Sequence, residues 1–175
     1  MPSGGVAKLL SMMTLLPGLG AHRLRRMTRR AFWRRFGRME HEQLEFKVSA
    51  NHLLESVVAM AMTRGGTILI GVSDARRIVG YAAGQEGLDR IALVAQETQV
   101  ELDMRRLCVG GIEVVAIGVP AVPDRLVTTP DGRILRRLGG TNQPLRGDAV
   151  ARFVQARAGL VLCSAAPYCS MNAAH

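Results

Sequence analysis

The stretch AMAMTRGGTILIGVSD, residues 59–74, decides the fold because it joins the end of a helix to the start of a buried strand. Apolar side chains recur at helical spacing just before and within it, at Leu53, Leu54, Val57 and Ala61. The sequence therefore predicts a helix over residues 52–63, ended by Gly65 and Gly66. The β-branched apolar run that follows, residues 67–72, predicts an interior strand.

Strand and helix patterns alternate on both sides of this stretch. A short strand is predicted before it, at residues 44–48, where apolar and charged side chains alternate. After it, the sequence predicts a hairpin arm, a second helix, three more strands and a final helix, at residues 77–81, 88–98, 100–109, 112–119, 133–138 and 147–157. This order predicts an α/β (α+β) fold, a mixed β-sheet with flanking helices.

The chain has 175 residues, which is room for one compact domain plus tails. With 48% hydrophobic and 21% charged residues, it has the composition of a globular protein rather than a disordered one. Its 23 basic and 14 acidic residues give a net charge of +9. Nine of the basic residues and no acid lie in residues 1–39, so the rest of the chain is electrically balanced.

The charge distribution sets off a basic leader at residues 1–39, and the lack of any period at residues 158–175 predicts a C-terminal tail after a domain at 40–157. We expect the leader to be disordered or a helical arm, and its deletion to leave the core folded. Three interpretations of the leader stay open: an arm for nucleic acid or another anionic surface, an organellar import segment, or an unstructured extension.

Several classes of protein are excluded or disfavoured. No apolar run approaches the roughly 18 residues that a membrane-spanning helix needs, so no membrane span is expected. Three cysteines without CxxC spacing disfavour a disulfide framework and a zinc site, and predict a reducing, cytoplasmic location. The four histidines form no zinc-hydrolase pattern.

Candidate catalytic residues lie on and beside the first predicted strand. Glu45 and Lys47 point the same way, and such a pair can bind a divalent cation and stabilise a phosphate. Asp74 follows the interior strand, and Glu40, with Glu42 as its competitor, adds a third acid. Three such acids would suit Mg²⁺ or Mn²⁺. The alternative is a surface salt pair worth about 0–1 kcal/mol beside an ordinary turn aspartate.

A second candidate group is basic and surrounds the predicted glycine turn at Gly139 and Gly140. It consists of Arg133, Arg136, Arg137 and Arg146. A glycine turn with free backbone N–H groups, flanked by arginines, suits contact with phosphate. The alternative is a solvated hairpin rim.

Several blocks of the sequence follow one another in a characteristic order: LEFK at residues 44–47, the stretch at 59–74, IVG at 78–80, the strand at 114–120 and RLGGTN at 137–142. Taken together, these blocks resemble the Schlafen AlbA-type domain family. The resemblance covers residues 40–157 and implies a mixed α/β domain that binds RNA or DNA. Bacterial members are described as ATP-binding, helicase-related or transcriptional regulators. In animal Schlafen proteins, related domains cleave RNA with three carboxylates, and Glu40, Glu45 and Asp74 are the matching positions here.

The sequence departs from the family pattern in two places. Met62 stands where the family usually has asparagine, and Leu135 and Arg136 stand where an aromatic residue usually precedes the Arg-x-Gly block. Loss of that stacking platform would weaken binding of single-stranded RNA.

Together, these features favour a nucleic-acid-binding domain. The more specific hypothesis is that this domain is an endoribonuclease that acts on structured RNA with Mg²⁺ or Mn²⁺. The alternative is a non-catalytic DNA-binding transcriptional regulator or an ATP-binding module. A homo-oligomer is a further hypothesis.

Overall fold

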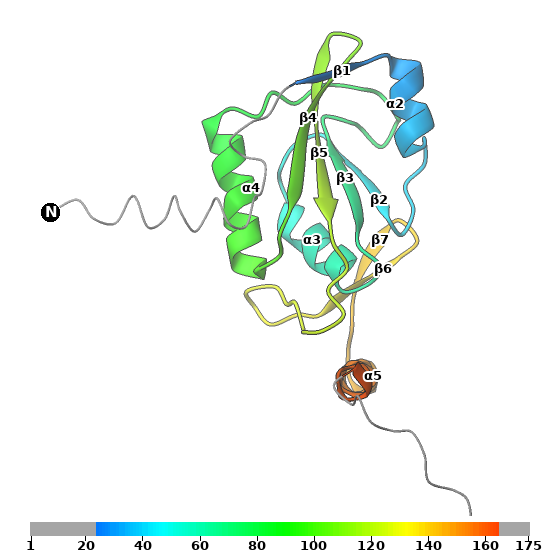
Figure 1. The fold of residues 1–175 in the computed structure, drawn as a ribbon, viewed down its shortest axis with the longest axis vertical. Helices are drawn as coiled ribbons and strands as arrows, with labels where there is room; N and C mark the ends of the chain where they lie inside the picture. Colours follow the sequence, from blue (N-terminus) through cyan, green and yellow to red (C-terminus); the bar gives the residue numbers. More distant parts are fainter. Residues whose placement is uncertain (1–23, 165–175) are drawn as a thin grey trace, which may run out of the picture.

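The structure of the chain, a computed structural model, describes residues 24–164, and their side chains as far as residue 158 (Figure 1). The first part of the expected leader, residues 1–23, and the last residues of the expected tail, 165–175, lie outside the described residues. The import-segment interpretation of the leader, which depends on its first residues, therefore stays a prediction.

A five-stranded mixed sheet forms the centre of the described part of the chain (Figure 1). Its strands, in the spatial order β1-β4-β5-β3-β2, are β1 (Arg25–Met27), β4 (Asp103–Val109), β5 (Ile112–Val119), β3 (Gly66–Ile70) and β2 (Leu44–Lys47). The two outer pairs, β1 with β4 and β2 with β3, are parallel, and the two inner pairs are antiparallel. The predicted mixed sheet with flanking helices is confirmed.

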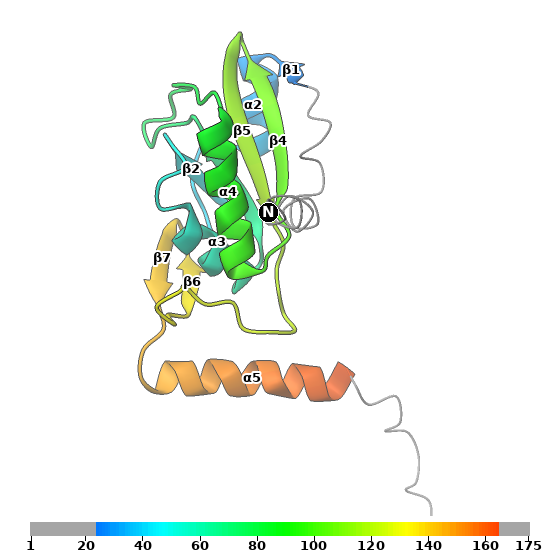
Figure 2. The ribbon, with the colours of Figure 1, turned by 90° about the vertical axis from the view of Figure 1, so that its left-hand side faces the viewer.

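Helices cover both faces of this sheet. One face carries α3 (Leu53–Ala61) and α4 (Gln85–Thr98), while α2 (Arg29–Phe36) lies behind the sheet in Figure 2. A separate hairpin of β6 (Leu135–Leu138) and β7 (Thr141–Pro144) packs beside α3. The final helix α5 (Asp148–Ser164) lies across one end of the molecule (Figure 2). Within the described residues, no helix combines the length and apolar content needed to cross a membrane.

Two hydrophobic clusters follow from this layering. The larger lies between the sheet and the pair α3 and α4, and its members include Val57, Met60, Ile68, Ile91 and Ile117. The smaller lies on the opposite face, where fully buried Phe32 of α2 packs with Phe46, Leu69, Val109 and Val114. A residue assigned to the leader therefore lies in the centre of a core cluster.

Residues 25–36 belong to the packed domain, which corrects the expectation of a separable leader. The strand β1 pairs with β4, from Arg25 opposite Leu107 to Met27 opposite Val109. Thr28 then caps α2, because its hydroxyl accepts a hydrogen bond from the N–H of Ala31 at 3.2 Å. The packed part of the chain thus extends to residues before the expected boundary at residue 40, and these contacts do not fit a deletion of residues 1–38 that leaves the core unharmed.

Three predicted elements differ from those observed. The expected hairpin arm at residues 77–81 is reduced to one bridge between Val72 and Ile78, because the N–H groups of Val79 and Gly80 both bond to the Gly71 carbonyl. Residues 141–144, for which the sequence predicted no strand, form β7. The last helix runs to Ser164 rather than ending near residue 157, so the expected tail is helical in its first part.

Backbone geometry requires glycine at both Gly65 and Gly66, between α3 and β3. Gly65 has a φ of 68°, and a Cβ there would lie 2.5 Å from the Val119 carbonyl oxygen. A Cβ on Gly66 would lie 2.5 Å from the Gln43 carbonyl oxygen. The chain therefore passes between two neighbouring backbones as it leaves α3 and enters β3, which only glycine permits.

Candidate functional site

The predicted site residue Glu45 lies on β2, and its carboxylate is buried and fully engaged. Its Oε2 is 2.5 Å from Nη1 of Arg137, and its Oε1 is 2.9 Å from Nζ of Lys47. Ser56 of α3 donates its hydroxyl to the same Oε1 at 2.8 Å. The predicted adjacency of Glu45 and Lys47 is therefore present, but two further donors complete the set.

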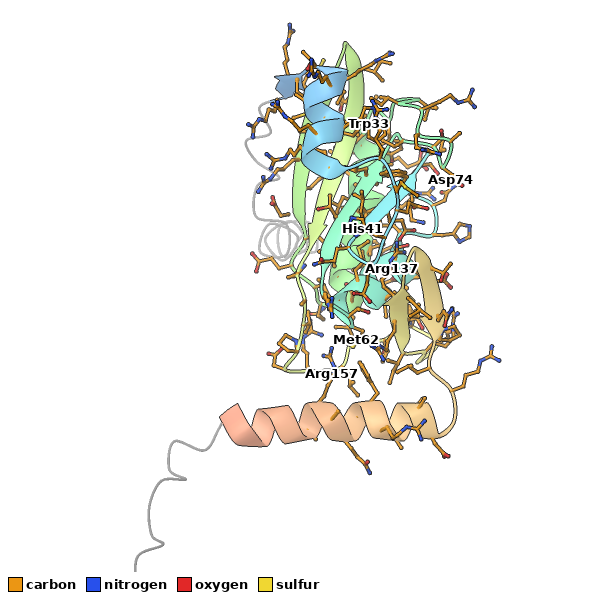
Figure 3. All side chains as sticks on the ribbon, turned by 90° about the vertical axis from the view of Figure 1, so that its right-hand side faces the viewer. Trp33, His41, Met62, Asp74, Arg137 and Arg157 are labelled. Atoms are coloured by element: carbon orange, nitrogen blue, oxygen red, sulfur yellow. The ribbon has the colours of Figure 1, made fainter. Side chains whose placement is uncertain are left out.

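Arg137, on β6, is the centre of this arrangement and only 1% exposed (Figure 3). Besides Glu45, its guanidinium donates to Oδ1 of Asn142 at 2.8 Å and to the carbonyl oxygens of His41 and Leu44, both at 3.2 Å. Its backbone N–H donates to the Thr63 hydroxyl at 2.8 Å. Only Nε of this guanidinium lacks a hydrogen-bond partner.

These contacts form what we call the Arg137 network, which consists of Glu45, Lys47, Ser56, Thr63, Arg137 and Asn142. The amide of Asn142 closes it by donating to the Ser56 hydroxyl at 3.2 Å. The network ties the β6–β7 hairpin to β2 and to the end of α3. Three sequence blocks that are far apart along the chain, residues 44–47, 59–74 and 137–142, thus meet in one buried polar cluster.

The other two predicted acids do not join Glu45. Glu40 accepts a hydrogen bond from the N–H of Phe46 at 2.7 Å, and so satisfies a backbone donor of β2 at the edge of the sheet. Asp74 lies in an exposed turn, well apart from Arg137 in Figure 3. Among the described residues, no group of three or more His, Cys, Asp or Glu side chains could hold a metal ion. As arranged here, the three acids do not fit a shared Mg²⁺ or Mn²⁺.

The four predicted phosphate-binding arginines have different environments. Arg137 is buried, and so is withdrawn from a ligand at the surface. Arg133 pairs with Glu55 at 2.9 Å and with Asp131 at 2.6 Å. Hydrogen bonds that Arg133 donates to Glu55 and then to Asp131 raise the pKa of Arg133, while hydrogen bonds that Asp131 accepts from Thr129 and Arg133 lower the pKa of Asp131. Arg136 and Arg146 are exposed, and only these two keep the predicted availability.

Of the residues that depart from the family pattern, Met62 and Leu135 lie in the core, whereas Arg136 is exposed. Met62 is buried, and its thioether sulfur accepts a hydrogen bond from the N–H of Val127 at 3.4 Å. Its carbonyl accepts from Arg157 of α5 at 3.1 Å, and burial lowers the pKa of that guanidinium (Figure 3). Leu135 is 2% exposed, so it fills the core rather than offering a surface for stacking.

The sequence assigned the arginines of residues 25–38 to a leader and did not predict that they lie on the surface of the folded domain. All seven arginines of residues 25–38 are exposed, and within the described part of the chain none of them has an acidic partner. We call this group the arginine surface: Arg25, Arg26, Arg29, Arg30, Arg34, Arg35 and Arg38. The only sign of this surface in the sequence is the run of arginines without an acid. The position of these arginines on the domain depends on the packing of α2 against the sheet.

Comparison with known proteins agrees with this fold. The family model described as "Schlafen, AlbA_2" matches residues 40–146. No curated protein matches the chain. Among solved structures, the DIP2311 protein from Corynebacterium diphtheriae has a TM-score of 0.54 and 23% sequence identity, which supports the fold alone. The match covers 66% of this chain and 24% of that one. Because the family model matches more than half of its residues, the chain belongs to the Schlafen AlbA_2 family.

Proposed function

We propose that this protein binds nucleic acid and does not cleave it by a metal-dependent reaction. Membership of the Schlafen AlbA_2 family suggests nucleic acid as the class of partner. The engagement of Glu45 in the Arg137 network is the observation that favours binding over cleavage. The carboxylate that a nuclease would need for its metal is already bonded to Arg137, Lys47 and Ser56.

A cation at Glu45 would have to compete with these donors. The guanidinium of Arg137 would then stay buried next to a metal, with its best anionic partner shared or lost. Removing one partner from a buried ion pair costs about 3–5 kcal/mol. Glu45 and Lys47 are therefore assigned a structural role, that of holding the β6–β7 hairpin against the rest of the domain.

The experiment is incubation of the full chain with transfer RNA in the presence of Mn²⁺ or Mg²⁺. We expect salt-dependent binding, because contacts to phosphates release counterions, and we expect no cleavage products. Binding is measured by fluorescence anisotropy, and cleavage by gel electrophoresis of the same samples.

Asp74→Asn is the decisive variant, because Asp74 is exposed and its change should leave the fold intact. Cleavage by the wild type that disappears in Asp74→Asn would establish the nuclease and overturn the proposal. Glu45→Gln is less informative for this purpose, since it disturbs the Arg137 network. A melting temperature raised by ATP, without binding of RNA or DNA, would instead favour a nucleotide-binding module.

A further inference from the structure

We propose that the arginine surface of β1 and α2 holds the sugar–phosphate backbone of a nucleic-acid duplex. This proposal rests on the proposed function and adds the location and the kind of ligand. The surface lies before residue 40, where the match to the family model begins, so the family itself does not assign it. Its seven arginines are exposed and without an acidic partner among the described residues.

Some of these charges oppose the helix on which they lie, whereas Arg34 and Arg35 lie in its last turn, where positive charge is favourable. The first turn of α2 contains no acid and begins with Arg29 and Arg30, at the end of the helix that carries partial positive charge. Arg30 and Arg34 are spaced i and i+4, where like charges repel. Both effects are unfavourable for an isolated helix, and an external polyanion would relieve them.

The two acids of the neighbouring strands β4 and β5 are already paired with arginines. Asp103 of β4 pairs with Arg105 at 2.5 Å, and Glu113 of β5 pairs with Arg106 at 2.7 Å. The hydrogen bond from Arg106 to Glu113 also raises the pKa of that guanidinium. The positive potential of the arginine surface is therefore not cancelled by its neighbours.

The surface is held in place rather than presented on a loose arm. Phe32 is fully buried beneath α2, and the Trp33 ring contacts the Phe46 ring of β2 edge-on, with centroids 5.9 Å apart. The Thr28 cap fixes the start of the helix. A surface that is ordered before it binds loses less conformational entropy on binding.

An open groove of about 210 Å³ lies between α2 and the sheet. Arg25 of β1, Arg35 of α2 and Arg105 of β4 line it, together with the Asp103 carboxylate that pairs with Arg105, and apolar and small side chains form the rest of its walls. Three guanidinium groups outnumber the one carboxylate in this groove, and each can donate two parallel hydrogen bonds to phosphate oxygens.

The orientation of the aromatic side chains favours a duplex over a single strand. Proteins that bind single strands stack bases on exposed aromatic rings. Here Phe32 is buried, Trp33 and Phe36 are half-buried, and arginines lie over them, with Arg38 6.0 Å from the Trp33 ring and Arg35 5.5 Å from the Phe36 ring. Contacts to a duplex backbone need no such platform.

A membrane is the less suitable anionic partner. A helix that lies on a membrane inserts its apolar face between the lipids. The apolar side of α2 is already used, because its aromatic residues pack against the sheet. The exposed side carries Arg30 and Arg34 and has no large apolar side chain to insert.

The test compares the full chain with a triple variant, R30A/R34A/R35A, on a duplex of about 20 base pairs, which is two helical turns. Binding is measured by anisotropy between about 50 and 200 mM salt. We expect affinity to fall at least about tenfold, and the slope of log K against log salt to become shallower by about 2–3. The matched control, R64A/R90A/R152A, removes the same charge from exposed arginines elsewhere, and should keep the wild-type slope.

Circular dichroism and the melting temperature check that the triple variant is folded, as expected for alanine on an exposed helical face. R30K/R34K/R35K, which preserves the charge, should keep most of the salt slope. Wild-type binding that is equally strong in the triple variant would overturn this proposal and leave the proposed function standing. No binding of any nucleic acid by the wild type would overturn both. Tighter binding of a single strand than of the duplex, or arginine-dependent binding only to phosphatidylserine vesicles, would overturn the duplex assignment.

Discussion

At the scale of single residues, the pair Glu45 and Arg137 decides how this domain is interpreted. From the sequence, one is a catalytic acid and the other a phosphate ligand. In the structure they are bonded to each other in the core, 7% and 1% exposed. Residues that characterise the resemblance to the family are thus part of the buried packing of the domain.

Removing one member of this pair should destabilise the domain strongly. Arg137→Met leaves the buried Glu45 carboxylate without its main partner, and we expect a loss of about 3–5 kcal/mol in the free energy of unfolding. The neighbouring exposed Arg136→Ala is the control, with an expected change within about 0.5 kcal/mol. Urea unfolding measures both, and equal effects of the two substitutions would contradict a buried ion pair.

A double-mutant cycle with Glu45→Gln measures the coupling directly. We expect the double variant to be less destabilised than the sum of the single variants, because the second change removes a partner that the first left unpaired. Strict additivity would show that the two side chains do not interact.

At the scale of elements, α2 is the part of the fold that the sequence predicted least well. It has eight residues, and its aromatic side chains Phe32, Trp33 and Phe36 form its inner face. A longer helix over residues 21–38 would place Leu24, Met27 and Ala31 on the apolar stripe instead. Met27 belongs to β1. The helical pattern over residues 21–38 therefore treats β1 and α2 as one helix and assigns the wrong residues to its inner face.

The strands and helices of the central stretch were predictable for the opposite reason. Within α3 and β3 the apolar residues follow a single period, and the double glycine marks the point where one period changes to the other. The adjacency of Glu45 and Lys47 was equally local, since residues at i and i+2 on a strand share a face. Arg137 reaches Glu45 across 92 residues, and no local pattern contains such a contact.

The packing of α2 can be tested with one core residue and one surface residue. Phe32→Ala removes a fully buried ring between α2 and the sheet, and should cost about 3–5 kcal/mol of stability. Arg34→Ala, on the exposed side of the same helix, should change it by no more than about 0.5 kcal/mol. If Phe32→Ala unfolds in urea like the wild type, α2 is not part of the domain core.

At the scale of the whole molecule, the net charge of +9 and the fold are connected through residues 24–39. The chain from residue 40 onward is electrically balanced. Seven of the nine excess positive charges lie on or next to β1 and α2, which also complete one edge and one face of the sheet. The same segment therefore supplies both the basic character of the domain and a layer of its core.

Two truncations separate this view from the simpler one of a detachable basic leader. A chain that begins at Leu24 keeps β1, α2 and the arginine surface, so we expect its thermal stability and nucleic-acid binding to match those of the full chain. A chain that begins at Met39 loses β1 and α2, which uncovers Phe46, Leu69 and Val114. We expect its melting temperature to fall by about 10–20 °C, as for a loss of several kcal/mol, and apolar dyes to bind.

The longer truncation cannot locate the binding surface, because it removes charge and core together. Its informative result is stability. If the chain that begins at Met39 melts at the same temperature as the full chain, β1 and α2 contribute nothing to the core and the leader is detachable after all. If it melts lower, while R30A/R34A/R35A melts like the full chain and loses duplex binding, one segment serves both folding and binding, through its inward aromatic residues and its outward arginines respectively.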